Sequence, residues 1–395
     1  MKKVTSRLVC MLLCLLLAVC LPVTAMATPN SAELRVGSSD LSGEGFAYTA
    51  STGTLELNNY SNTAGIQMDG DTVIMLTGEN TINMTAPNGT TCAEALYSAG
   101  SLTIGGNGKL TITMNMGTQN CEVGLVGIMV QKNLVIQDGA QVVIDIKGGV
   151  DSRTKGVWAK NGVKVQDSAS VDMDVVEPNN VTVSNPIDVY GVYADNGEIA
   201  FSGTSKVNID VVGTTALYAK SNVSISDNAD VAISGGTDSA VNAADILVNG
   251  KKLTIVNAIN GLKALNGIQI KNTEVDVTVD VTGIYVGKDI TMENSKVSSV
   301  AKDVNAILTT DGKVTITKTT LTAKGGQYGI YAKDDVTITN SAENAVNVEG
   351  GRYGIFTNGD VKVAGGTLSA KSTSNNKDYC AISAKKFEVE AAQII

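Results

Sequence analysis

A short phrase decides the fold of this chain, and it is clearest at Gly329-Ile330-Tyr331-Ala332. The turn Lys333-Asp334-Asp335 follows it, and then comes the alternating run Val336-Thr337-Ile338-Thr339. After Asn340-Ser341, a further run, Ala345-Val346-Asn347-Val348, leads toward the next phrase. Alternation of apolar and polar residues is typical of β-strands, and Asn, Asp and Gly are favoured in the turns between them. The stretch therefore predicts three short strands in succession.

The opening phrase is a small residue followed by a branched apolar residue and often an aromatic one, and it recurs along the chain. Its thirteen copies begin at Gly65, Ala95, Gly127, Gly156, Gly191, Ala216, Ala240, Gly261, Gly283, Ala306, Gly329, Gly354 and Ala381. The mean spacing is about 26 residues, and a period of this size indicates a solenoid. No copy contains a stretch of about 10 residues with helical periodicity, which a leucine-rich or helical repeat needs. The sequence therefore predicts an all-β fold, a parallel β-helix of about thirteen coils with three strands in each.

The phrase also predicts which side chains face the interior. Its second residue is apolar in all thirteen copies and points inward, and strand alternation then sends the third residue outward. Equivalent residues of neighbouring coils lie about 4.8 Å apart, so outward aromatic residues form a ladder. Because sugar rings have apolar faces that stack on aromatic rings, the sequence predicts a carbohydrate-binding ladder made of Tyr97, Trp158, Tyr193, Tyr218, Tyr285, Tyr331 and Phe356. The alternative is that Tyr is simply a good strand residue with a polar tip.

Two further observations concern this surface. The longest interval between phrases runs from Gly156 to Gly191, and its extra residues, around 177–187, are either an insertion bordering the binding face or a tolerated surface loop. A second aromatic column, Tyr328, Tyr353 and Tyr379, directly precedes the small residue of three successive phrases. Alternation predicts that these three residues point inward or into a bend, in a structural role.

Composition narrows the chemistry. The 395 residues include no His, which excludes catalytic triads that need imidazole, His-ligated zinc and His acid–base catalysis. The formal net charge of −9 argues against nucleic acid or anionic lipid as partners and suits divalent cations. Acidic residues recur at the turn after the first strand, and the sequence predicts calcium ligands at Asp289, Asp311, Asp335 and Asp360. Ordinary turn chemistry, in which Asp is favoured, is the alternative.

Residues 1–27 are predicted to be a secretory signal peptide. A basic start precedes an apolar stretch over 8–23, and Ala25-Met26-Ala27 is a small-residue cleavage signal. A lipoprotein signal with its modified residue at Cys20 is the alternative. Removing the segment takes away three basic and no acidic residues and lowers the net charge from −9 to −12. No later segment has the roughly 18 consecutive apolar residues of a membrane span, so we expect a secreted or cell-surface protein.

The rest of the chain is predicted to contain two parts. Residues 28–64 lie outside the repeat and are expected to cap the N-terminal end of the β-helix, which occupies 65–395. The final residues are strand-like without a cap, which predicts a truncated chain or an end covered by a partner. Cys92 and Cys121 precede neighbouring phrases and are within range of a disulfide, whereas Cys380 is expected to stay unpaired.

A resemblance accompanies this pattern. The segment Leu41-Ser42-Gly43-Glu44-Gly45-Phe46, continuing to Leu55-Glu56-Leu57-Asn58-Asn59-Tyr60, and runs such as Leu102-Thr103-Ile104-Gly105-Gly106 resemble exported β-helix proteins of Clostridia-type bacteria. These are commonly named carbohydrate-binding domain-containing proteins. The resemblance covers about residues 41–395, and its motifs are mostly coil-forming. It implies a right-handed β-helix, calcium sites and polysaccharide binding, and it assigns no individual binding residue.

The sequence therefore predicts an exported β-helix that binds a plant or cell-wall polysaccharide along its outer face, assisted by calcium. One alternative is a surface adhesin or spacer without glycan specificity. Another is a polysaccharide lyase similar to pectate lyases, a class that shares the fold. A lyase needs a strong base such as Arg or Lys beside carboxylates, and a hydrolase needs two carboxylates at a set separation. The sequence nominates neither arrangement, so no catalytic residue is predicted.

Overall fold

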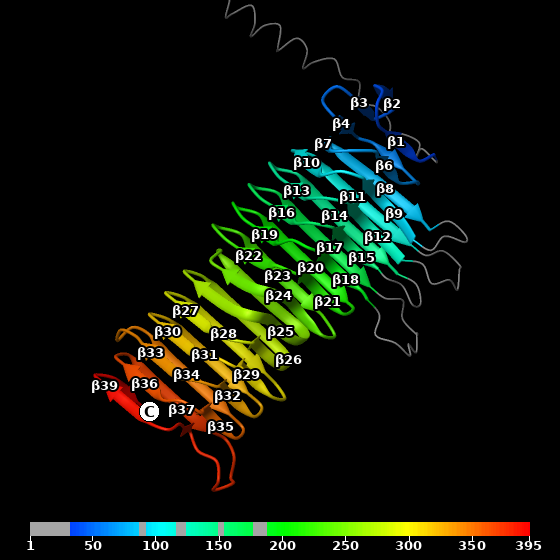
Figure 1. Cartoon of the computed structure of the whole chain (residues 1–395). Coiled ribbons are helices and arrows are strands. Elements are labelled where there is room, and N and C mark those ends of the chain that lie inside the picture. Colours follow the sequence, from blue (N-terminus) through cyan, green and yellow to red (C-terminus); the bar gives the residue numbers. More distant parts are fainter. Residues whose placement is uncertain (1–31, 87–91, 116–123, 149–153, 177–187) are drawn as a thin grey trace, which may run out of the picture.

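The computed structural model describes residues 32–86, 92–115, 124–148, 154–176 and 188–395. Every regular element in these residues is a β-strand, and the strands stack into one elongated body (Figure 1). The predicted all-β, mainly parallel fold is therefore confirmed. The described residues contain no helix that is long and apolar enough to cross a membrane. The predicted signal peptide, Cys121 and the insertion at 177–187 lie outside the described residues.

Most strands pair in parallel with the third strand before and the third strand after them, which produces three ladders. Ladder A contains the strands of the repeated phrase. Its members are β1 (Leu34–Val36), β6 (Ile66–Met68), β9 (Cys92–Ser98), β12 (Gly124–Val130), β15 (Lys155–Ala159), β18 (Tyr190–Ala194), β21 (Thr215–Ala219), β29 (Asn305–Thr309), β32 (Tyr328–Ala332), β35 (Tyr353–Thr357) and β38 (Ile382–Ser383).

Ladder B follows ladder A along the chain in each repeat. Its members are β4 (Thr54–Asn58), β7 (Thr72–Thr77), β10 (Leu102–Gly106), β13 (Leu134–Ile136), β16 (Val163–Val165), β19 (Ile199–Phe201), β22 (Asn222–Ile225), β27 (Ile290–Glu293), β30 (Val314–Thr317), β33 (Val336–Thr339), β36 (Val361–Ala364) and β39 (Phe387–Glu390).

Ladder C completes each repeat before the chain returns to ladder A. Its members are β5 (Ser61–Asn62), β8 (Glu79–Thr85), β11 (Lys109–Asn115), β14 (Gln141–Lys147), β17 (Ser170–Val176), β20 (Lys206–Val212), β23 (Asp230–Gly235), β28 (Lys296–Ala301), β31 (Thr320–Gly325), β34 (Ala345–Gly350), β37 (Thr367–Ser372) and β40 (Gln393–Ile394). In the middle of the stack, three long strands continue from one ladder into the next. They are β24 (Ser239–Val248), β25 (Lys252–Lys271) and β26 (Glu274–Val286).

One continuous apolar core runs through the stack. The second residue of the phrase is buried in twelve copies, from Ile66 to Ile355, and Ile382 in the thirteenth copy is half-buried against the core. The predicted inward direction of this residue is confirmed. We call one strand from each ladder in sequence a rung, and neighbouring rungs are about 4.8 Å apart, as in any β-sheet.

The small residue of the phrase also faces the interior. The pairing of β12 with β15 passes from Val126 with Lys155 to Ile128 with Val157 and omits the small residues between them. A Cβ atom on Gly156 would lie 2.3 Å from Met173 Sδ, and one on Gly329 would lie 2.4 Å from Val348 Cγ1. Each phrase therefore has two successive inward residues, and the space beside the first accepts only a small side chain.

This doubled inward pair overturns one expectation. Strand alternation counted across the phrase predicted that Tyr328 and Tyr353 point inward or into a bend. Because two inward residues follow one another, the residue before them points outward instead, and both tyrosines are only half-buried. Their rings lie 5.3 Å from that of Tyr331 and 5.2 Å from that of Phe356, respectively, so they belong to the outer face of ladder A.

The N-terminal end of the stack has a different topology. Strands β2 (Leu41–Gly43) and β3 (Phe46–Thr49) pair antiparallel, and β3 pairs antiparallel with β4. Buried Tyr60 meets Phe46 edge to face at 5.7 Å, and its hydroxyl accepts a 2.6 Å hydrogen bond from Asn62 Nδ2. Strand β1 of the same segment pairs in parallel with β6 in ladder A. This is the segment predicted to be the cap.

Candidate functional site

The aromatic residues predicted to face outward fall into one register column of ladder A. Along the stack, the column reads Tyr97, Met129, Trp158, Tyr193, Tyr218, Asn242, Lys263, Tyr285, Leu308, Tyr331 and Phe356. All its members are half-buried, as expected for side chains that stand on the outside of a sheet. The column is interrupted, however, so Tyr97 and Tyr285 stand apart from two groups of rings in mutual contact.

The first aromatic cluster consists of Trp158, Tyr190, Tyr193 and Tyr218. The rings of Tyr193 and Tyr218 are stacked, with centroids 4.8 Å apart and planes 9° from parallel. Tyr190 lies beside both rings, at 4.8 Å from Tyr193 and 5.7 Å from Tyr218. Tyr190 precedes the small residue Gly191, so it belongs to the neighbouring outward column. The sequence did not predict Tyr190 as a site residue, because strand alternation with a single inward residue does not place it on the outer face.

Ring orientation decides what this cluster presents to a ligand. The stacked rings of Tyr193 and Tyr218 cover one face of each other. Trp158 lies 6.4 Å from Tyr193 with its plane turned by 89°, so it is not part of that stack. A ligand with an apolar face would therefore contact Trp158, while the tyrosines supply hydrogen-bonding hydroxyl groups.

A lysine lies within the first aromatic cluster. Lys155 is 6% exposed, and its Nζ lies 4.9 Å from the centroid of the Trp158 ring and 5.4 Å from that of Tyr193. Such contacts are attractive because the ring faces carry negative charge density. Burial raises the pKa of Tyr193 and of Tyr190, and the charge of Asp195 adds to the rise at Tyr193. Both phenols therefore keep their protons and can donate hydrogen bonds at physiological pH.

The second aromatic cluster lies on ladder A toward the C-terminal end. Its members are Tyr328, Tyr331, Tyr353, Phe356 and Tyr379. Tyr331 and Phe356 are stacked at 5.3 Å, and Tyr328 and Tyr353 are stacked at 5.8 Å in the parallel column beside them. Arg352 Cζ lies 5.8 Å from the centroid of Tyr379, so this cluster also contains a cation against a ring.

The predicted calcium ligands lie between strands, and two of them accept backbone hydrogen bonds. Asp335 Oδ1 accepts from the N–H of Asp360 at 2.8 Å, and Asp289 Oδ1 accepts from the N–H of Lys313 at 3.0 Å. No group of three or more acidic, Cys or His side chains in the described ranges is placed to hold a metal ion. Ca²⁺ takes six to eight oxygen ligands, so a site at these turns would need backbone carbonyls or water besides the carboxylates. Turn chemistry accounts for Asp335 and Asp289, and the calcium site stays a prediction.

A row of carboxylates crosses the outer face of ladder C. Asp145, Asp174 and Asp210 are direct partners in the pairing of β14, β17 and β20. Asp174 and Asp210 line a shallow groove of about 410 Å³, together with Asp172 and Asn208. Burial raises the pKa of Asp174, and the charges of Asp145 and Asp210 raise it further. This row was not found from the sequence, because its residues alternate with apolar ones as in any half-exposed strand.

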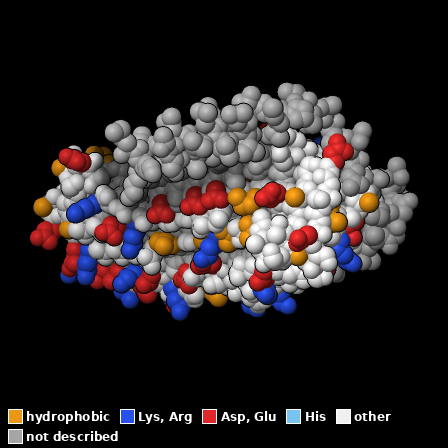
Figure 2. All heavy atoms as spheres, turned by 90° about the horizontal axis from the view of Figure 1, so that it is seen from above, with side chains coloured by type: hydrophobic (Ala, Val, Ile, Leu, Met, Phe, Trp, Pro, Cys, Tyr) orange, Lys and Arg blue, Asp and Glu red, His pale blue; other side chains and the backbone are white. Residues whose placement is uncertain are grey.

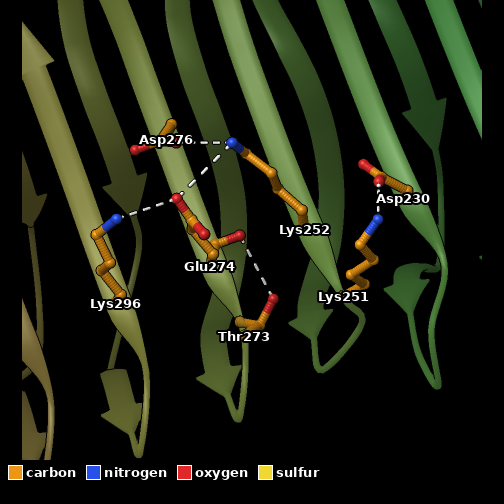
Figure 3. A network of polar contacts seen from close by, with 7 residues as sticks. All are labelled: Asp230, Lys251, Lys252, Thr273, Glu274, Asp276 and Lys296. Carbon is orange, nitrogen blue, oxygen red and sulfur yellow. Dashed lines mark hydrogen bonds and ion pairs between the residues drawn. The ribbon is translucent and has the colours of Figure 1, made fainter.

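Most charges elsewhere on ladder C are neutralised in pairs. Lys252 Nζ lies 3.3 Å from Asp276 and 3.7 Å from Glu274, and Lys296 Nζ lies 3.2 Å from Glu274 (Figure 3). The hydrogen bond from Lys296 and the charge of Lys252 lower the pKa of Glu274. On the face seen in Figure 2, acidic side chains form a row and basic ones are interspersed among acidic ones. Exposed pairs of this kind contribute little to stability, and because the charges are paired within the protein they do not indicate a binding site for a charged ligand.

The described cysteines carry free thiols. Burial and the nearby Glu94 raise the pKa of half-buried Cys92 to about 12, so this thiol is protonated and unreactive at neutral pH. Cys380 is exposed, and its Sγ donates to the carbonyl of Ile382.

Comparison of the chain with family models, with curated proteins and with solved structures found no match. The candidate site therefore rests on its own geometry, in which the two aromatic clusters of ladder A are the largest groups of rings in contact.

Proposed function

We propose that the chain is a right-handed parallel β-helix of about thirteen coils that is exported after loss of residues 1–27 and binds an extended polysaccharide along ladder A. The observation that carries the proposal is the first aromatic cluster, in which Trp158, Tyr193 and Tyr218 occupy three successive rungs. A ring turned out of the tyrosine stack and neutral phenols together offer apolar contact and hydrogen bonds. A glycan uses both kinds of contact.

The binding surface suits a polymer better than a small molecule. Rings on one ladder recur at the rung spacing, and they line neither of the two grooves of about 410 and 200 Å³ beside ladder C. A chain of sugars lying along the stack would meet equivalent groups at successive rungs. Calcium at Asp289, Asp311, Asp335 and Asp360 belongs to the proposal as a support for the turns beside ladder A.

The first test is a pull-down of the mature protein on insoluble cellulose, xylan, pectic polysaccharide and bacterial cell wall. We expect the wild type to bind at least one of them and Trp158→Ala to bind it about tenfold more weakly, which corresponds to about 1.4 kcal/mol. Leu265→Ala is the matched control, because Leu265 is 72% exposed and lies outside the aromatic clusters. Equal thermal melting of the three proteins shows that the loss is local. Failure of the wild type to bind any of the four materials favours the adhesin or spacer alternative.

The carboxylate groove of ladder C favours a second candidate, glycoside hydrolysis. Its lining contains neither Arg nor Lys, so it lacks the base that a lyase needs. The raised pKa of Asp174 favours a general-acid role, and Asp145 and Asp210 are the carboxylates beside it. Release of reducing ends from the bound polysaccharide, abolished by Asp174→Asn, would support this activity; release that persists in Asp174→Asn would contradict it.

A further inference from the structure

The two aromatic clusters are separate along the stack but stand on the same ladder. The first cluster ends at Tyr218, and the ring contacts of the second begin at Tyr328 and Tyr331. Four rungs of the outward column lie between Tyr218 and Tyr331, and they carry Asn242, Lys263, Tyr285 and Leu308. The space between the clusters is therefore part of the same surface.

The distance between the clusters follows from the pairing register. Tyr193 and Tyr331 are six pairing steps apart on ladder A. At about 4.8 Å for each step, Tyr193 in the middle of the first cluster and Tyr331 at the near edge of the second lie about 29 Å apart. A ligand must have about this length to reach from the middle of the first cluster to the second.

The clusters contain the same kinds of side chain. Each fills two neighbouring outward columns with rings, and each holds one cation against a ring, Lys155 in the first and Arg352 in the second. The doubled inward pair of the phrase makes both outward columns available in every rung, and rings occupy them in these two places.

The column between the clusters carries one charged side chain, and that charge is paired within the protein. Lys263 Nζ lies 3.0 Å from Asp238 Oδ1, so this amino group is neutralised within the protein. Asn242 is an uncharged neighbour in the same column. A chain that crosses these rungs meets no unpaired charge on the column and a single isolated ring, Tyr285, so the groups of rings in mutual contact lie only at its two ends.

We propose that the two clusters are two subsites for one linear, unbranched glycan that lies along ladder A and spans at least about 29 Å. The inference rests on the proposed function and adds a minimum length to it. Once one end is held, binding of the second subsite is intramolecular, and such linkage raises affinity without any new type of contact. Short oligosaccharides occupy one cluster and bind weakly.

The test measures affinity against ligand length by calorimetry. The probes are soluble xylan, homogalacturonan and mixed-linkage β-glucan, each beside its own oligosaccharides graded from well below to above about 29 Å. We expect affinity of the wild type to rise at least about tenfold once the length exceeds about 29 Å. Trp158→Ala and Phe356→Ala should each abolish the rise and keep the weak binding of short chains, and Leu265→Ala should keep the rise.

A second variant protects the test against misfolding. Phe356→Leu keeps the apolar volume that packs against Tyr353 and removes only the ring, and it should behave as Phe356→Ala does. Binding of polymer by the wild type without any dependence on length overturns the inference and leaves the proposed function standing, as does an unchanged length effect in both Phe356 variants. Absence of binding to every polymer and oligosaccharide overturns the proposed function and the inference together.

Discussion

At the scale of the residue, the small first position of the phrase controls the whole surface. Gly or Ala there lets the backbone of ladder A approach the side chains of ladder C, as Gly156 does at Met173 and Gly329 at Val348. The inward pair that results reverses the alternation and places Tyr190, Tyr328 and Tyr353 outside. A structural requirement of the core thus determines which residues a ligand can touch.

A substitution at this position should be costly. Gly329→Ala would bring the new Cβ within 2.4 Å of Val348 Cγ1 and 2.7 Å of the carbonyl oxygen of Gly354, and backbone cannot yield as a flexible side chain would. We expect a loss of about 1–3 kcal/mol in the free energy of unfolding, as for overpacked cores. Gly70→Ala, where nothing lies within 4 Å of the added atom, should change stability by less than about 0.5 kcal/mol. Urea unfolding measures both, and equal effects would contradict the inward placement.

The carboxylate row predicts a pH effect. Burial and the charges of Asp145 and Asp210 raise the pKa of Asp174, so the folded state binds this proton more tightly than the unfolded chain does. The stabilisation is present below the ordinary carboxyl pKa and is lost as the pH rises through the raised value. Asp174→Asn should therefore be slightly more stable than the wild type at pH 7, by less than about 0.5 kcal/mol because solvent screens an exposed carboxylate, and should match it near pH 3.

A matched variant on the same ladder should behave in the opposite way. Asp230 forms an ion pair with Lys251, whose Nζ lies 2.8 Å from Asp230 Oδ2, so Asp230→Asn should lower stability slightly at pH 7. A lower melting temperature for Asp174→Asn at pH 7 would show that the row of carboxylates is not repulsive.

At the scale of the element, each rung is held in register by short strands and by carboxylates in the turns. Asp245 accepts from the N–H of Gly267 at 3.0 Å and Asp71 from that of Ser101 at 2.8 Å, and Asp289 and Asp335 repeat this contact in other rungs. The same type of bond thus links one turn to the next. It explains why Asp recurs at these positions even without a bound cation.

This contact separates two explanations of the turn carboxylates. Asp335→Ala removes the acceptor for the N–H of Asp360 and should cost about 1 kcal/mol, whereas Asp335→Asn keeps an acceptor oxygen and should stay near the wild type. Thermal melting with added calcium and with a chelator completes the experiment. A chelator-dependent loss of stability that the wild type shows and both variants lack would place calcium at this turn.

The strands themselves could be predicted from the sequence, and the ring geometry could not. The alternating run Val336-Thr337-Ile338-Thr339 is strand β33 as expected, because its period matches a half-buried strand. The inward pair was missed because Gly and Ala have no side chain whose polarity could mark them as buried. Whether Tyr193 stacks on Tyr218 or turns aside depends on packing between rungs, and no periodicity along the chain records it.

At the scale of the whole molecule, the repeated phrase was enough to predict a long all-β stack of parallel strands. The pairing of each strand with the third before and after it is the direct outcome of three runs in each repeat. The position of the candidate site followed in part, since the outward column was expected from alternation. The division of that column into two clusters depends on which rungs carry Asn242, Lys263 and Leu308, and a count of aromatic residues does not show it.

The inward pair gives the molecule a modular design. Every rung carries its own copy of the two outward positions. Between Ala240 and Gly354 the phrases are about 23 residues apart, and gain or loss of one such unit would leave the rings inside each cluster undisturbed. Only the separation between the clusters would change, by one strand spacing at a time. Duplication of a single unit in the gene is thus a simple evolutionary route by which the reach of this surface could be adjusted while the chemistry at either end is inherited intact.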